Sequence, residues 1–345
     1  MNYPTIKTQI EKSGHIQGIA YDRAGGYMYC SFTTILVKTD MSGNIVGTVD
    51  GIVGHLGCIA FDEKTRRVYG SLEYKNDVIG RSILKYQNSS VSFDDSFYIV
   101  HFDADKIDRV GMNAEKDGVM KAVYLRDVVS DFKYDKHRYG CSGIDGVTFA
   151  PDVENGGDKM FLYVAYGIYS DIERNDNDYQ VILKYDTECW DKYAMPLCQN
   201  EMHTSGPEKY DEKYFVYTGN TNYGVQNLEY DPYTNTIFAA VYRGKKPEYE
   251  NYSFFMIDLG EKPRVEMLKG MNEQGKVLSL KKIGNYDEKN DVYGWFFKYG
   301  TTGMVSLGDG YYYFSQNWEK DDWFGTKIYL YRWDGENPFA LIEES

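Results

Sequence analysis

The stretch His15-Ile16-Gln17-Gly18-Ile19-Ala20-Tyr21-Asp22 recurs as His55-Leu56-Gly57-Cys58-Ile59-Ala60-Phe61-Asp62. Each copy continues through a short polar turn into a second run of apolar and aromatic residues, at 27–32 and 67–72. Apolar and polar positions alternate with a period of two, which predicts strands, and the short turn joins each pair of strands into a β-hairpin. The chain is therefore predicted to be built by repetition of one β unit.

Three weaker copies of this unit open at residues 143–149, 224–231 and 301–307. A third apolar run follows each hairpin, at 35–39, 83–86, 181–185, 254–257 and 328–333. A fourth run follows several of them, at 45–49, 264–268 and 339–342. Groups of four antiparallel strands without a helical stretch predict an all-β fold. We expect a single β-propeller domain over residues 1–345, with five four-stranded blades that open near residues 15, 55, 143, 224 and 301.

The long interval between the second and third copies leaves a six-bladed propeller as an alternative. Residues 97–102 and 122–125 are strand-like, but no copy of the opening motif accompanies them, which favours five blades.

Residues 5–10 are also predicted to form a short strand. We expect it to pair with the run at 339–342, because this pairing would tie both chain ends into one blade and remove an open edge.

Composition limits the partners and the compartment. The net charge is −14, whereas phosphate binding needs a basic face, so neither nucleic acid nor an anionic membrane is an expected partner. No apolar run approaches the length of a transmembrane helix, and the chain start lacks a basic segment followed by an apolar one. The five cysteines are odd in number and lack metal-ligand spacing, and Cys30 and Cys58 lie inside predicted strands. These features predict reduced thiols and a cytoplasmic location.

The predicted connections are unequal in length. Turns within the hairpins are short, whereas the loops after second strands and between blades are long, and both of these kinds of loop lie on one face of a propeller. Long connections in a compact domain are more often functional, although a surface also tolerates variable loops that have no function. We expect a site on this long-loop face, at the mouth of the central channel. The long connections are 74–80, 103–120, 127–142, 167–178, 199–223, 243–252, 271–301 and 316–327.

Alignment of the five copies gives one column of residues that should surround the channel mouth. Its members are Gln17, Gly57, Asp145, Gln226 and Thr302. Side-chain oxygens of this kind, with backbone carbonyls and water, suit a hard cation such as Ca²⁺, so Gln17, Asp145, Gln226 and Thr302 are candidate metal ligands. Asp145 is the one carboxylate among them. Alternatively, the ring is polar because the channel holds water.

Two histidines, His15 and His55, open adjacent repeats and are expected to lie side by side. Such a pair could bind a transition metal, take part in acid–base chemistry, or hydrogen-bond the neighbouring blade. Aromatic and basic residues also gather on the long-loop face, and a polar ring with aromatic walls is typical of a site for a small polar ligand such as a sugar or nucleotide. The candidate ligand-binding residues are His15, Gln17, His55, Asp145, Gln226, Asn227, Thr302, Arg243 and Trp295.

The order of the hairpin motifs resembles that of five-bladed propellers, and the soluble calcium-activated nucleotidases (apyrases) are similar in layout. That family places Ca²⁺ in the central channel, held by residues at the start of successive inner strands. The resemblance covers most of the chain in strand order and implies a Ca²⁺ at the channel-mouth column. The sequence has no match to the family's arginine-rich substrate loop, and Asp145 is the single acidic residue at the corresponding positions.

Three functional hypotheses follow, and the sequence does not decide whether the protein is an enzyme. The first is a non-catalytic propeller that binds a small polar ligand or a partner at the channel mouth. The second is a Ca²⁺-dependent hydrolase of phosphate or sugar esters at the same place, which requires a divalent cation and Asp145. The third is a protein-interaction scaffold. A single ring carboxylate favours binding over hydrolysis, and a fold alone does not fix function.

Overall fold

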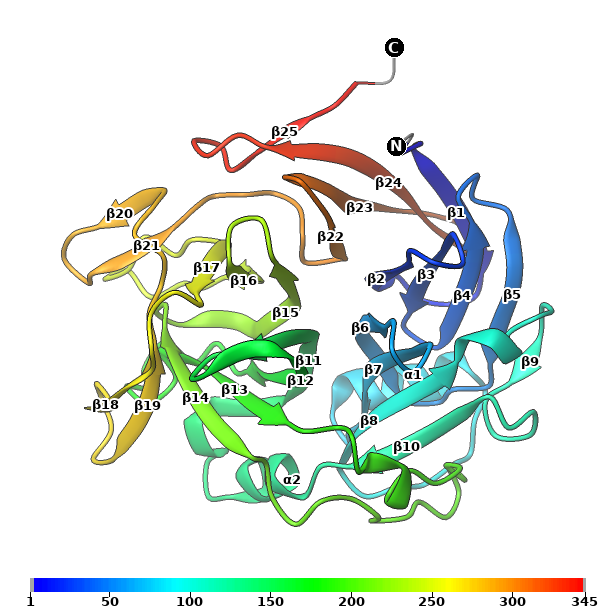
Figure 1. Cartoon of the computed structure of the whole chain (residues 1–345). Helices are drawn as coiled ribbons and strands as arrows, with labels where there is room; N and C mark the ends of the chain where they lie inside the picture. Colours follow the sequence, from blue (N-terminus) through cyan, green and yellow to red (C-terminus); the bar gives the residue numbers. More distant parts are fainter. Residues whose placement is uncertain (1–2, 344–345) are drawn as a thin grey trace.

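The innermost strands of five β-sheets surround a central axis, and each sheet extends outward from the axis as one blade (Figure 1). The structure is a computed structural model and describes residues 3–343. It is an all-β fold and a five-bladed β-propeller, which confirms the prediction from the repeat. The hairpins that form the inner half of the blades are buried almost continuously along their length, because the side chains of each face of a strand pack against a neighbouring blade.

The strands of each blade follow one another antiparallel from the axis outward. The first blade contains β2 (Ile16–Asp22), β3 (Tyr27–Phe32), β4 (Ile35–Asp40) and β5 (Ile45–Asp50). The second contains β6 (His55–Asp62), β7 (Arg67–Tyr74), β8 (Ser96–Asp103) and β10 (Met120–Tyr124). The third contains β11 (Cys141–Asp152), β12 (Gly156–Ile168), β13 (Tyr179–Tyr185) and β14 (Glu212–Tyr217). The fourth contains β15 (Thr221–Asp231), β16 (Thr236–Arg243) and β17 (Phe254–Asp258), and the fifth contains β22 (Met304–Gly308), β23 (Tyr311–Lys320), β24 (Trp323–Trp333), β1 (Ile6–Glu11) and β25 (Phe339–Leu341).

Short elements extend the blades at their outer edges. Parallel pairing adds β9 (Met112–Asn113) to β5 and β19 (Gln274–Leu278) to β14, and β18 (Arg264–Met267) pairs with β19. Residues 264–268, expected as a fourth strand of the fourth blade, therefore extend the third blade instead. The remaining elements are β20 (Asn285–Asp287), β21 (Val292–Gly294), α1 (Val78–Tyr86), α2 (Arg126–Lys133) and the 3₁₀ turns η1 (Ala104–Lys106), η2 (Arg138–Gly140) and η3 (Trp190–Lys192).

The second blade departs most from the sequence prediction. Residues 83–86, expected as its third strand, belong to the helix α1, which begins where the Asp77 carboxylate accepts a hydrogen bond from the Gly80 backbone N–H at 2.8 Å. Such an N-cap satisfies a backbone donor of the first helical turn. The strand-like runs at 97–102 and 122–125 lie in β8 and β10, so they complete the second blade and do not form a sixth.

Two of the long connections also differ from expectation. Residues 103–120 join the third strand of the second blade to its fourth, and the Ala104 backbone N–H donates to the carbonyl of Arg66 in the β6–β7 turn at 3.2 Å. This connection therefore lies on the face opposite the long-loop face. Residues 316–327 are not a loop, because β23 and β24 remain paired as far as Lys320 and Trp323.

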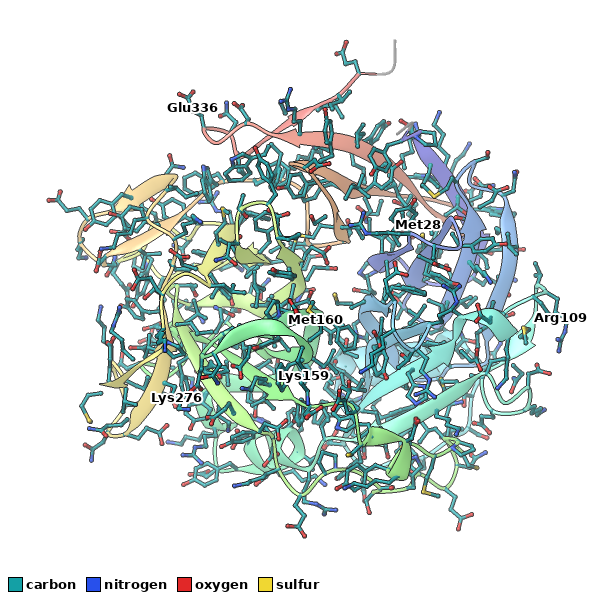
Figure 2. The ribbon with its side chains drawn as sticks, viewed as in Figure 1. Met28, Arg109, Lys159, Met160, Lys276 and Glu336 are labelled. Atoms are coloured by element: carbon teal, nitrogen blue, oxygen red, sulfur yellow. The ribbon has the colours of Figure 1, made fainter. Side chains whose placement is uncertain are left out.

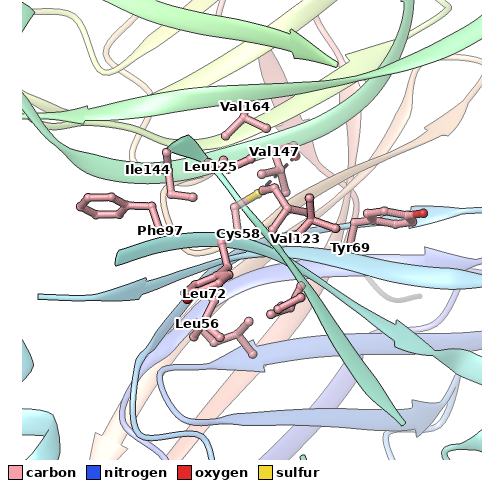
Figure 3. Packing of buried hydrophobic residues seen from close by; sticks show 14 of the residues in the cluster. Leu56, Cys58, Tyr69, Leu72, Phe97, Val123, Leu125, Ile144, Val147 and Val164 are labelled. Carbon is pink, nitrogen blue, oxygen red and sulfur yellow. Dashed lines mark hydrogen bonds between the residues drawn. The ribbon is translucent and has the colours of Figure 1, made fainter. Parts of the chain in front are cut away.

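Apolar side chains fill the space between neighbouring blades, while charged residues such as Arg109 and Glu336 point outward at the rim (Figure 2). Between the second and third blades, Cys58 packs with Leu56 and Val147 (Figure 3). Its thiol donates to the Val147 carbonyl at 3.5 Å, and burial raises its pKa to about 12. Cys30 is likewise a buried free thiol, as predicted. None of the helices in residues 3–343 is both long enough and apolar enough to cross a bilayer.

Both ends of the described chain attach to the same strand, β24. The strand β1 pairs antiparallel with it, from Ile6 opposite Ile328 to Glu11 opposite Trp323, and β25 pairs with its other half. The expected closure of the ring is therefore present, but the expected partner of residues 5–10 was wrong, since they and residues 339–341 both pair with β24 and not with each other. The reason is the length of β24, which offers room for two short strands end to end.

The closure predicts unequal effects of two neighbouring substitutions in β1. Ile6 is fully buried in the core between the fifth and first blades, whereas Lys7 is exposed. Ile6→Ala should lower the free energy of unfolding by about 2–5 kcal/mol through lost apolar burial and the cavity that remains. Lys7→Ala should leave it almost unchanged. Urea unfolding of both variants checks this, and equal stabilities would contradict the role of β1 in the closure.

Candidate functional site

The channel-mouth column coincides with irregularities in the pairing of the inner strands. In β2 the pairing passes from Ile16 to Gly18, which leaves Gln17 as an extra residue. In β15 it passes from Val225 to Asn227, which does the same for Gln226. Comparable register shifts bracket Gly57 in β6 and Asp145 in β11. A β-bulge redirects a side chain and is common beside functional sites, so four of the five aligned positions are bulge positions.

The residue that follows a channel-mouth position lies against the neighbouring inner strand. A methyl group added to the α-carbon of Gly18 would lie 2.9 Å from the Ile59 backbone nitrogen, and one on Gly303 would lie 2.8 Å from that of Ile19. In the fourth blade Asn227 takes this position, and its amide donates to the carbonyls of Gln17 at 2.9 Å and Thr301 at 3.1 Å. These contacts leave no room for a side chain at the glycines, and they hold the inner strands together.

A cavity of about 590 Å³ opens at the channel mouth. Its walls come from four blades and from α1, with Gln17 and Thr33 on one side and Asn222 and Tyr242 on another. The cavity gathers five of the residues that the sequence predicted to bind a ligand: His15, Gln17, His55, Asp145 and Gln226.

The other predicted site residues lie outside this cavity lining. Asn227 joins the inner strands, as described above, and the hydroxyl of Thr302 donates to the Ser315 carbonyl at 3.2 Å. The guanidinium of Arg243 stacks on the Phe296 ring at 4.5 Å and donates to the Asn251 carbonyl. Trp295 is buried, and its indole N–H donates to the Glu336 carbonyl at 3.0 Å.

Two charged residues of the cavity, Glu73 and Lys75, escaped the sequence prediction. The Lys75 ammonium lies 2.9 Å from one carboxylate oxygen of Glu73 and donates to the Ser142 carbonyl at 3.0 Å. The other oxygen of Glu73 accepts the Ile144 backbone N–H at 2.7 Å. Burial raises the pKa of Glu73, and the Lys75 charge opposes this effect. The available signal was the Glu-Tyr-Lys alternation at the end of β7, which places both charged side chains on one side of the strand.

Both histidines of the cavity are uncharged near neutral pH. Burial lowers the pKa of His15, and it lowers that of His55 to about 3. The amide nitrogen of Gln17 lies 3.0 Å from Nε2 of His15, to which it donates. Nδ1 of His55 is buried without a hydrogen-bond partner among the described residues and lies 3.8 Å from Glu73. Since buried polar atoms are normally paired, this nitrogen is an unsatisfied polar atom of a residue that lines the cavity.

Asp145 carries the carboxyl group at the centre of the column. Its Oδ1 accepts the Cys58 backbone N–H at 3.3 Å, and its backbone carbonyl accepts the Ser71 hydroxyl at 2.7 Å. Burial, and next the negative charge of Glu73, raise the pKa of this carboxyl well above its ordinary value. Without a counter-charge, the carboxyl therefore retains its proton to a higher pH than an exposed aspartate does.

This protonation predicts a pH-dependent effect of Asp145→Asn. The ordinary pKa of the group is 3.8, and its pKa in the folded state is higher. Above pH 3.8 the folded state thus binds more protons than the unfolded state, so the wild type loses stability as pH rises, by at most about 1.4 kcal/mol per pH unit. Asp145→Asn removes this loss.

We expect Asp145→Asn to unfold at a higher urea concentration than the wild type at pH 7, with the gap closing as pH approaches 4. Urea unfolding across this pH range measures the gap. Asp158→Asn, an exposed site on β12, is the charge-matched control and should show no such trend. A constant gap between Asp145→Asn and wild type would contradict the assigned protonation.

Two tyrosines form an aromatic wall of the cavity. The rings of Tyr223 and Tyr242 meet edge to face with centroids 6.5 Å apart, and both side chains remain partly exposed. Tyr223 has a φ of +67°, in the left-handed region that a bulky side chain rarely occupies. Strain of this kind costs about 1–3 kcal/mol and is concentrated at functional sites. In this strained backbone conformation the Tyr223 side chain lines the cavity.

The strain at Tyr223 predicts different stabilities for two variants that both remove the ring. Asn tolerates the left-handed region, whereas Leu does not. Tyr223→Asn should therefore be more stable than Tyr223→Leu by about 1 kcal/mol. Thermal unfolding of the pair measures the difference, and a more stable Tyr223→Leu would show that the ring's conformation is unstrained.

The donor atoms of the column do not fit a Ca²⁺ ion. Such a site needs several oxygen ligands, including more than one carboxylate for useful affinity, and Asp145 is the only carboxylate of the column. The amide nitrogen of Gln17 donates to His15 and Thr33, and the Thr302 hydroxyl is bonded to the Ser315 carbonyl of the fifth blade. Within residues 3–343 no three His, Cys, Asp or Glu side chains form a group that could hold a metal ion.

Comparison with known proteins identifies no family for this chain. No protein-family model matches the chain, and no curated protein matches it. A soluble aldose sugar dehydrogenase from Escherichia coli has a TM-score of 0.40 at 10% identity, over 95% of this chain and 99% of that one. A glutaminyl cyclase from Myxococcus xanthus has a TM-score of 0.38 at 9% identity, over 99% and 100%. The Dos1 propeller has a TM-score of 0.36 at 9% identity, over 96% and 59%.

Proposed function

We propose that this protein binds a small polar ligand in the channel-mouth cavity. The observation that carries the proposal is the convergence of polar side chains from several blades on one cavity of about 590 Å³. Sites for small molecules have this size and combine apolar walls with a few well-placed polar groups. A water-filled channel would not require the strained ring of Tyr223 at its rim.

The cavity has a polar floor and an apolar side. Gln17, Gln226 and Asp145 supply amide and carboxyl groups on the floor. Val78 and Ile79 of α1 also line the cavity, although 72% and 40% of their surfaces are exposed. Exposed apolar side chains beside a polar floor suit a ligand with one polar and one apolar face, and its binding would cover them.

The Ca²⁺-dependent hydrolase is the less favoured reading of the same site. It requires a divalent cation, and the donor atoms of the column do not fit one. Asp145 and Glu73 are the two carboxyl groups of the cavity, but Glu73 is bound to Lys75 and to the Ile144 backbone. Hydrolysis through a pair of free carboxyl groups is thus not supported.

The proposal predicts that a ligand stabilises the fold and that blocking the cavity removes this effect. A ligand at one hundred times its Kd raises the free energy of unfolding by about 2.7 kcal/mol. Monosaccharides, nucleotides, amino acids and small amines form the test panel, and thermal unfolding is the measurement. At least one compound should raise the melting temperature of the wild type.

Ser82→Trp provides the test of location. Ser82 is exposed on α1 and lines the cavity, so an indole there should fill the mouth and abolish the shift. Lys85→Trp, also exposed on α1 but not part of the lining, is the matched control and should retain it. A shift that survives in Ser82→Trp would place binding elsewhere, and a protein-interaction scaffold would show no shift with any compound.

A further inference from the structure

The buried carboxyl groups of residues 3–343 fall into two classes with one exception. Four of the seven form an ion pair with a lysine or arginine. The pairs are Asp22 with Arg66 at 2.7 Å, Glu73 with Lys75 at 2.9 Å, Asp131 with Lys213 at 2.5 Å and Asp178 with Lys246 at 2.5 Å. A buried carboxylate without a counter-charge is costly, so such pairing is expected.

Two other buried carboxyl groups are satisfied by several donors. Asp231 accepts the Thr234 backbone N–H at 2.9 Å, the Ser306 hydroxyl at 2.7 Å and the Tyr312 hydroxyl at 2.9 Å. Asp287 accepts the Asn290 side-chain amide at 2.7 Å and two longer backbone N–H bonds. Multiple hydrogen bonds stabilise an ionised carboxylate that has no cation beside it.

Asp145 belongs to neither class. Its carboxyl is 8% exposed, accepts one long bond of 3.3 Å from the Cys58 backbone and is hydrogen-bonded by the Gln226 amide. No lysine, arginine or histidine forms an ion pair with it within the described chain. It is also the only one of the three unpaired buried carboxyl groups that lines the channel-mouth cavity. The buried carboxyl group that lacks a counter-charge is therefore the one that faces the cavity.

We propose that the ligand of this cavity is a small organic cation whose ammonium group pairs with Asp145 and lies against the rings of Tyr223 and Tyr242. This inference rests on the proposed function of the cavity as a ligand site. An ammonium group supplies the missing counter-charge, and tyrosine rings attract cations through their π faces, most strongly where water is excluded. Both rings line the cavity together with the carboxyl group.

The other titratable groups that line the cavity add no net charge, so Asp145 determines the charge of the cavity. Glu73 and Lys75 neutralise each other at 2.9 Å. The rings of His15 and His55 are uncharged, because burial lowers the pKa of both. An ionised Asp145 therefore gives the cavity one net negative charge, which matches a monovalent cation. The net charge of −14 on the whole chain also attracts cations to the surface.

Binding of such a cation should release a proton. In the empty cavity the Asp145 carboxyl retains its proton to a higher pH than an exposed aspartate does, since burial and the charge of Glu73 raise its pKa. A permanent cation favours the ionised form, so the carboxyl loses its proton to the buffer when the cation binds. The affinity for a permanent cation should accordingly increase from pH 5 to pH 8. His55 stays neutral over this range because burial lowers its pKa to about 3, and Lys75 stays paired with Glu73. Burial lowers the pKa of His15 below its ordinary 6.5, so this ring is neutral in the upper part of the range.

The experiment uses two probes of nearly the same shape and different charge. Choline carries a quaternary ammonium, and 3,3-dimethyl-1-butanol replaces its nitrogen by carbon. Isothermal titration of the full-length protein should show that choline binds at least about tenfold tighter than the neutral probe. Asp145→Asn should lose this preference, and Asp158→Asn should keep it. Titration with choline in two buffers of different ionisation enthalpy should show proton release in the wild type and none in Asp145→Asn.

Each contrary result has a distinct meaning. Equal binding of the two probes, unchanged in Asp145→Asn, overturns the cationic ligand but leaves a ligand site that Ser82→Trp would still block. Stabilisation by CaCl₂ that disappears in Asp145→Asn overturns it in favour of a metal site. Absence of binding by choline and by ethanolamine, a smaller ammonium probe, also overturns it. If no compound of the wider panel binds either, the proposed function fails as well.

Discussion

The close approach of the inner strands is the constraint on which the rest of the structure depends. Gly18, Gly146 and Gly303 each follow a channel-mouth residue, and a side chain at any of them would collide with the neighbouring blade. Only five blades surround the axis, so the inner strands are crowded there. In β2 and β11 a bulge precedes the glycine that the next blade contacts. The bulge then directs the preceding side chain to the channel mouth.

Burial at that mouth determines the chemical state of the groups it collects. The same desolvation that lowers the pKa of His15 and His55 raises that of Asp145, because a charge of either sign is disfavoured away from water. Glu73 and Lys75 remain charged only as a pair. The cavity is therefore close to neutral when empty, and a ligand that brings its own charge changes the balance at Asp145 first.

The repeat made the fold predictable, and it made part of the site predictable too. Gln17, Asp145 and Gln226 could be found because they occupy one position of a recurring motif. Glu73 and Lys75 could not, because they lie beyond the end of the motif, Glu73 near the end of β7 and Lys75 just after it. The helix α1 was missed for a different reason: a short apolar run such as residues 83–86 cannot be assigned to a helix or a strand by periodicity alone. Arg243 and Trp295 showed the converse, since loop position in the sequence does not reveal whether a side chain is packed against its neighbours.

Symmetry and its absence have separate roles in this molecule. The positions that repeat from blade to blade build the scaffold: they set the close contacts, the bulges and the ring of polar side chains. The features that occur once build the site, namely the Glu73–Lys75 pair, the wall from α1 and the strained Tyr223. A ring of identical positions presents similar groups in every direction, which suits water better than a ligand of definite shape. Because the unique features all border one cavity, one side of the ring differs from the rest in shape and chemistry, and selective binding requires such a difference.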